Sequence, residues 1–159
     1  MIKAEHKNPV YDAIKERGYV YLLMFREIEK RYSKEEAISV MRNVSRAQGI
    51  SSGQSMGHLA PRNFKGMCQA WVMSPDEGKT FQPDVRKLDD TGLEVKMMSC
   101  PIKDAWTDAG CTDEEVCTLL YCASAYDEAA IETAGFNCEI ELWSPGKSGC
   151  CLTRITEKT

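Results

Sequence analysis

Two cysteines of this chain stand where a thiol could act as a nucleophile. Cys100 closes a segment of alternating apolar and charged residues and is followed by Pro101 and a short helical pattern. The N–H groups at the start of a helix favour a negative charge, and the thiolate is the reactive form of cysteine. Cys150 follows the Gly-rich turn 144–149, where backbone N–H groups can hold an anion. The alternative for each is a buried thiol that fills space at a strand end.

Other residues could join a site built around these thiols. Cys122 and Asp127 are expected near a junction between two helical segments, where either side chain could turn inward. Asp127 is equally explained as an acidic residue at a helix N-terminus. His58 lies in a Gly-flanked loop and could close over a pocket, although such a histidine is more often an exposed imidazole. The cysteines on predicted apolar faces, which we expect in the core, are Cys68, Cys117 and Cys138.

The cysteine pattern does not indicate a structural zinc site. No Cys-x-x-Cys pair occurs, and the only histidines are His6 and His58. Cys111, Cys117 and Cys122 are six and five residues apart, which matches no zinc knuckle. We therefore expect no cofactor from these residues alone.

Composition and charge restrict the class of protein. The 159 residues are 43% hydrophobic and 28% charged, as is usual for a globular protein. A net charge of −4 offers no basic field for a phosphate backbone, so nucleic acid is not an expected partner. The sequence has no signal segment and no apolar run of membrane length, so no membrane association is expected. Eight cysteines without a secretory signal predict reduced thiols in a cytoplasmic protein.

The first half of the chain is predicted to be helical. Asn8 and Pro9 start a helix that runs to Tyr32, and a capping box over 33–36 starts a second helix that ends at Gly49. Together they form a helical hairpin. The other predictions for this half are a loose lead-in over 1–7, a loop over 50–62, a third helix over 63–74, a turn over 75–78 and a loop or edge strand over 81–92.

The second half predicts a small antiparallel sheet with helices on one face. The elements expected are a strand over 93–97, a short helix over 102–109, a capped helix from 112 that continues over 127–134, and strands over 136–142 and 150–156. A strand over 150–156 would point Cys150 and Cys151 to opposite faces. We expect a single α+β domain over 1–159, with a helical part over 1–74 and a sheet-and-helix part over 93–156 that carries the site.

The order of these features resembles the family named for L-2-amino-thiazoline-4-carboxylic acid hydrolase. That family has a Cys at the end of its first strand, a Cys followed closely by Asp, and Gly-x-x-x-Cys-Asp-Phe near its C-terminus. The matching positions here are Cys100, Cys122 with Asp127, and Gly146 with Cys150. The gap from Cys122 to Asp127 is wider than usual, and Cys151-Leu152 replace the Asp-Phe pair. The resemblance covers residues 93–156 well and the N-terminal helices in general layout.

The resemblance implies a hydrolase that opens a small cyclic amidine at a C–N bond, such as 2-amino-thiazoline-4-carboxylate to S-carbamoyl-cysteine. The thiolate of Cys150 or Cys100 would attack the amidine carbon, and Asp127 would handle the proton of the leaving nitrogen. The residues implied in substrate binding are Cys122, Gly146 and His58. In the alternative mechanism Cys100, Asp127 and Cys150 hold a divalent metal such as zinc. We favour the thiolate, because no histidine stands at a family position to complete a zinc shell.

A non-enzymatic module that binds or senses a small molecule is the second hypothesis. A polar cavity where Cys100, Asp127 and Cys150 converge would favour hydrolysis, whereas a long apolar cavity would favour binding or sensing. Either function takes a small-molecule partner, and both leave open a homo-oligomer.

Overall fold

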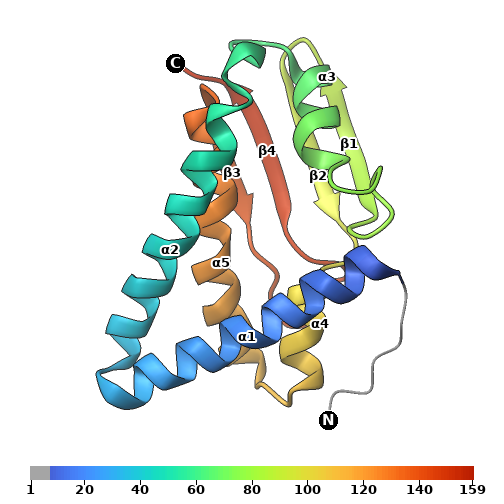
Figure 1. The fold of residues 1–159 in the computed structure, drawn as a ribbon. Coiled ribbons are helices and arrows are strands. Elements are labelled where there is room, and N and C mark those ends of the chain that lie inside the picture. The colour runs from blue at the N-terminus through green and yellow to red at the C-terminus, as the bar shows by residue number, and fades with distance from the viewer. Residues whose placement is uncertain (1–7) are drawn as a thin grey trace.

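The computed structural model describes residues 8–159, in which helices pack on one face and beyond one end of an antiparallel sheet (Figure 1). The elements in chain order are α1 (Pro9–Arg31), α2 (Lys34–Gln54), the 3₁₀ turn η1 (Gly57–Leu59), α3 (Phe64–Met67), the π-helical turn η2 (Cys68–Val72), β1 (Pro83–Asp89), β2 (Gly92–Met97), α4 (Pro101–Asp108), α5 (Asp113–Thr133), β3 (Phe136–Glu141) and β4 (Leu152–Glu157). This order confirms the predicted α+β class. The predicted lead-in over 1–7 lies outside the described residues.

Local capping signals set the starts of the long helices. The Asn8 side chain accepts a hydrogen bond from the Tyr11 backbone N–H at 2.7 Å, directly ahead of α1. Ser33 caps α2 in the same way, through the Glu36 backbone N–H at 3.0 Å. Thr112 begins α5 with a complete capping box. The predicted starts are therefore confirmed, because each depends only on residues three apart.

The second helix does not end at Gly49, as the sequence suggested. α2 continues for another turn, so the loop predicted over 50–62 begins later and contains η1. Gly49 packs against α5, where a Cβ would overlap the Tyr126 carbonyl oxygen. Gly53, one turn on, packs in the same way against the Ala130 carbonyl oxygen. These glycines allow the backbones of α2 and α5 to pack closely, and α2 continues through both of them.

The predicted helix junction near Asp127 is also wrong. α5 is one unbroken helix, and Asp127 lies well inside it. It runs beside α2 over much of its length (Figure 1). No helix in residues 8–159 has both the length and the apolar character needed to cross a bilayer.

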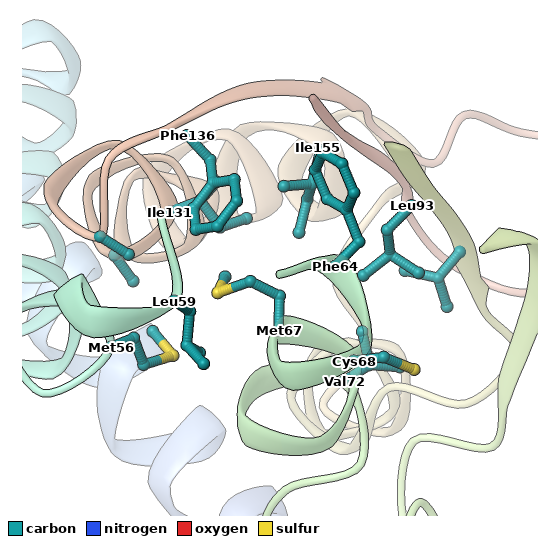
Figure 2. Packing of buried hydrophobic residues seen from close by; sticks show 13 residues of the cluster. Met56, Leu59, Phe64, Met67, Cys68, Val72, Leu93, Ile131, Phe136 and Ile155 are labelled. Atoms are coloured by element: carbon teal, nitrogen blue, oxygen red, sulfur yellow. The ribbon is translucent and has the colours of Figure 1, made fainter. Parts of the chain in front are cut away.

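The sheet has the strand order β1-β2-β4-β3, with every neighbouring pair antiparallel. β1 is an edge strand, which was one of the two predictions for that segment. One face packs against α3, η2 and the C-terminal part of α5 (Figure 2). The buried side chains of this sheet cluster include Phe64, Met67, Cys68, Val72, Leu93, Val95, Ile131, Phe136 and Ile155. On the outer face, the Arg154 guanidinium pairs with the Glu94 carboxylate at 2.9 Å.

A second group of buried side chains, the helical cluster, joins α1, α2, α4 and α5. Its members include Leu22, Phe25, Ala37, Met41, Cys100, Trp106, Val116, Leu119, Cys122 and Cys150. Trp106 is fully buried, and its Nε1 donates to the Gly18 carbonyl at 2.7 Å. A Cβ at Gly18 would lie 2.7 Å from the Ile102 Cα, so this glycine permits the close crossing of α1 and α4.

Candidate functional site

A polar cleft opens at the end of the sheet where the chain leaves β2 for α4. Its volume is about 300 Å³, the lower end of the range usual for small-ligand sites. The residues that line it are Gln82, Met98, Ser99, Cys100, Lys103, Asp104 and Gly149. Of the candidates expected from the sequence, Cys100 alone is in this set.

Backbone pairing brings the two expected thiols to the same place. The Cys150 N–H donates to the Met97 carbonyl at 2.8 Å, and the Met97 N–H donates to the Cys151 carbonyl at 3.0 Å. These bonds extend the pairing of β2 and β4 by one step, toward Cys100. Gly149 has a φ of +68°, and a Cβ there would lie 3.0 Å from the Met97 carbonyl oxygen. Glycine therefore suits both the conformation and the close approach of this segment.

Cys100 combines access to the cleft with a position at the start of a helix. It is the N-cap residue of α4, with an extended backbone, and Pro101 follows at the first helical position. Its side chain makes no capping hydrogen bond, and 9% of the residue is exposed. The helix macrodipole favours negative charge at this end. Cys100 thus lines the cleft at the N-terminal end of α4.

Cys150 and Cys151 lie ahead of β4 and not within it, so the prediction that they point to opposite faces is wrong. Their sulfur atoms are 3.6 Å apart. Cys150 is 3% exposed. A hydrogen bond with Cys100 is the main cause that raises the pKa of the Cys150 thiol. The hydrogen bond with Cys150 likewise raises the pKa of Cys151. The raised pKa keeps the Cys150 thiol protonated, close to both Cys100 and Cys151.

The first turn of α4 adds a pair of opposite charges that the sequence analysis missed. Lys103 and Asp104 both line the cleft. The Tyr11 hydroxyl, from α1, donates to Asp104 Oδ2 at 2.5 Å. The Lys103 ammonium lies 4.4 Å from the centroid of the Trp143 ring. An acidic residue in the first turn of a helix is common, so no sequence pattern indicates that this one faces a cleft.

Asp127 lies in a different environment, facing the sheet side of α5. Burial is the main cause that raises its pKa to about 7; the charge of Glu128 adds to it, and a hydrogen bond with Trp71 opposes it. Burial, followed by the charge of Asp127, raises the pKa of Cys138 to about 12. Asp127 is thus a carboxyl group that titrates near neutrality, but it does not line the cleft.

The remaining sequence candidates also lie away from the cleft lining. Cys122 is fully buried in the helical cluster, and burial raises its pKa to about 11. Gly146 is exposed in the turn before Cys150, with a φ of +86°. His58 is exposed on η1, near the end of β4 opposite to Cys150. Nearby Arg62 marks that end by pairing with Glu157 at 2.6 Å.

The metal-dependent alternative finds no support in the arrangement of these side chains. Across residues 8–159, no three His, Cys, Asp or Glu side chains are grouped so that they could hold a metal ion. In particular, Asp127 does not join Cys100 and Cys150 in such a group.

The sequence matches a known protein family over most of its length. The model of a family described as L-2-amino-thiazoline-4-carboxylic acid hydrolase matches residues 12–146. The match includes the N-terminal helices as well as Cys100, Lys103 and Asp104, and it ends before Cys150. No curated protein matches the chain at a significant level.

Proposed function

Because this chain belongs to the L-2-amino-thiazoline-4-carboxylic acid hydrolase family, we propose that it hydrolyses a small cyclic amidine in the cleft beside Cys100. The observation that carries the proposal is a cleft in which one thiol at a helix start lies beside a lysine and an aspartate. A ring that bears an amidinium and a carboxylate has charges opposite to those of Lys103 and Asp104. The compound in the family name, 2-amino-thiazoline-4-carboxylate, is such a ring.

In the proposed reaction, the Cys100 thiolate adds to the ring carbon that is bonded to sulfur and to two nitrogens. The bond from this carbon to the ring nitrogen breaks, and the nitrogen leaves as an amine after taking up a proton. Water then adds to the same carbon, loses its protons to solvent, and expels Cys100 as a thiolate. One water is consumed, one ring C–N bond is broken, and the product is S-carbamoyl-cysteine.

The two expected nucleophiles are assigned different roles. Cys100 lines the cleft, whereas Cys150 is more deeply buried and its pKa is raised by the hydrogen bond with Cys100. We therefore assign the attack to Cys100, and to Cys150 a hydrogen bond that stabilises the attacking thiolate. Asp127 is assigned no step, because it does not line the cleft. The mechanism needs reduced thiols, which agrees with the cytoplasmic location expected from the sequence.

The binding-only hypothesis is favoured by no observation of comparable weight. The cleft is polar, and a second hollow, lined by side chains of α1 and α5 together with Lys34 of α2, has a volume of about 50 Å³. That volume is too small for a stored ligand.

The test is ring opening of 2-amino-thiazoline-4-carboxylate by four proteins. They are the wild type, Cys100→Ser, Cys150→Ser and the control Cys111→Ser, whose thiol is partly exposed and does not line the cleft. We expect Cys100→Ser to lose more than about 10³-fold in kcat, Cys150→Ser to lose less, and Cys111→Ser to match the wild type.

Two outcomes would contradict the assignment. Full activity of Cys100→Ser would remove it as the nucleophile, and the absence of turnover by the wild type would contradict hydrolysis itself. Product analysis separates the bonds: a new primary amine marks C–N cleavage, whereas a new thiol marks C–S cleavage.

A further inference from the structure

Asp104 of α4 contributes a carboxylate to the cleft wall. A hydrogen bond from Tyr11 of α1 holds this carboxylate in place. We infer that Asp104, positioned by Tyr11, selects cationic ring amidines over neutral rings of the same size. The inference assigns a specificity residue and rests on the proposed function for its substrate class. The binding preference itself does not require turnover.

The hydrogen bond from Tyr11 fixes the carboxylate without using up its acceptors. Tyr11 is 3% exposed, and its hydroxyl lies 2.5 Å from Asp104 Oδ2. Burial, followed by this hydrogen bond to Asp104, raises the pKa of Tyr11 well above its ordinary value. The phenol therefore stays protonated and remains a donor. An ionised carboxylate accepts several hydrogen bonds, so acceptor positions remain for a ligand.

The helices that carry this pair are held rigidly against each other. The Trp106 Nε1 donates to the Gly18 carbonyl at 2.7 Å at the crossing of α1 and α4. Asp104 thus differs from a mobile surface carboxylate, because its orientation is set before a ligand arrives. Such preorganisation lowers the entropic cost of binding.

The chemistry of an amidinium fits this carboxylate. An amidinium is planar and carries two parallel N–H donors, which pair with the two oxygens of a carboxylate and gain from opposite charge. A neutral ring with a carbonyl in place of the exocyclic nitrogen lacks both the charge and the second donor. Lys103, the neighbouring charge in the cleft, attracts an anion and does not favour the cation. Among the residues that line the cleft, Asp104 is therefore the one whose carboxylate can pair with both N–H donors of the amidinium.

The experiment compares binding of two small rings by calorimetry. The cationic probe is 2-amino-2-thiazoline, and the neutral probe is 2-thiazolidinone. The variants are Asp104→Asn, Tyr11→Phe and the control Asp108→Asn, which removes the same charge one turn along α4, outside the cleft lining. We expect Asp104→Asn to weaken binding of the cation by about 10- to 100-fold and to leave the neutral ring unchanged.

Tyr11 acts through Asp104, and a double variant tests this. Tyr11→Phe should weaken the cation by about 3- to 10-fold, whereas adding it to Asp104→Asn should have little further effect. With the carboxylate-bearing substrate, Asp104→Asn should raise KM more than it lowers kcat. Circular dichroism melts check that each variant folds. If Asp104→Asn does not fold, Tyr11→Phe, which keeps the aromatic ring, tests the inference in its place.

The inference fails if Asp104→Asn binds both probes as Asp108→Asn does, or loses both probes equally. Its failure is distinct from that of the proposed function. Binding of the cation that depends on Asp104 without ring opening would contradict hydrolysis alone. Ring opening that does not depend on Asp104 would contradict this inference alone.

Discussion

The sheet cluster and the helical cluster are both buried, but only the helical cluster contains a residue that lines the cleft. The sheet cluster packs the apolar face of four strands against α3, η2 and α5, and the cleft lies beyond it. The helical cluster includes Cys100, which lines the cleft, and Cys150, which does not. Each cluster contains a cysteine that is 3% exposed, Cys68 in one and Cys150 in the other. Burial alone therefore does not distinguish a thiol that only packs from the thiol to which we assign a role in the proposed reaction; their neighbouring groups differ.

The largest effect that separates the clusters is expected at Phe136. This fully buried ring packs against Phe64, with the ring centroids 5.7 Å apart. Phe136→Ala should lower the free energy of unfolding by about 3–5 kcal/mol, because it removes a large buried side chain and leaves a cavity. Urea unfolding measures the loss, and kcat per folded molecule should stay at the wild-type value. A changed kcat with unchanged stability would contradict the separation.

A smaller effect is expected from the pH dependence of Asp127. Its pKa is about 7 in the folded protein and near its ordinary value of 3.8 when unfolded. The folded state therefore binds this proton more tightly, and the stability gained below the lower value is lost as the pH rises toward the higher one. The loss should be on the order of 2–3 kcal/mol, allowing for solvent screening of a half-buried group.

The control for this pH dependence is Asp127→Asn, which removes the titrating group and keeps its shape. Urea unfolding at a series of pH values between ~4 and ~8 should show a flatter profile for the variant than for the wild type. Equal slopes for the two proteins would show that Asp127 is not the group responsible.

The smallest effect on stability, and the sharpest test of the comparison, is the matched pair Cys68→Ala and Cys150→Ala. Both should lower the free energy of unfolding by about 1–2 kcal/mol, because each removes one buried sulfur atom. Turnover should fall only in Cys150→Ala, which loses the hydrogen bond to Cys100. Stability from urea unfolding and kcat from ring opening give the two readouts. Equal kcat values would place Cys150 with the packing thiols.

Sequence reasoning was sufficient where the deciding interactions are local. Asn8, Ser33 and Thr112 each cap a helix through a residue three positions on, so their patterns are visible in a short window. Alternating side chains predicted β2 and β3 because one face of each strand is buried. Cys100, Asp127 and Cys150 were expected to converge at one end of the sheet. Cys100 lies close enough to Cys150 to affect its pKa, whereas Asp127 does not line the cleft.

The features that the sequence could not show depend on distant partners. Gly49 was interpreted as a helix stop, but its role depends on the Tyr126 carbonyl of another helix. Asp104 resembles any acidic residue in a first helical turn until the position of Tyr11, 93 residues away, is known. The location of Asp127 against Trp71 likewise requires the packing of α5 on η2.

The cleft and the capped helices are expected to form at different stages of folding. The cleft is assembled from the β2–α4 connection, Gln82, Gly149 and the supporting Tyr11, so its walls meet only when several long loops have closed. Closing long loops costs entropy before the contacts that compensate for it can form. The capped helices, by contrast, need only their nearest neighbours in the chain. A chain caught partway through folding would thus be helical and yet unable to recognise its ligand.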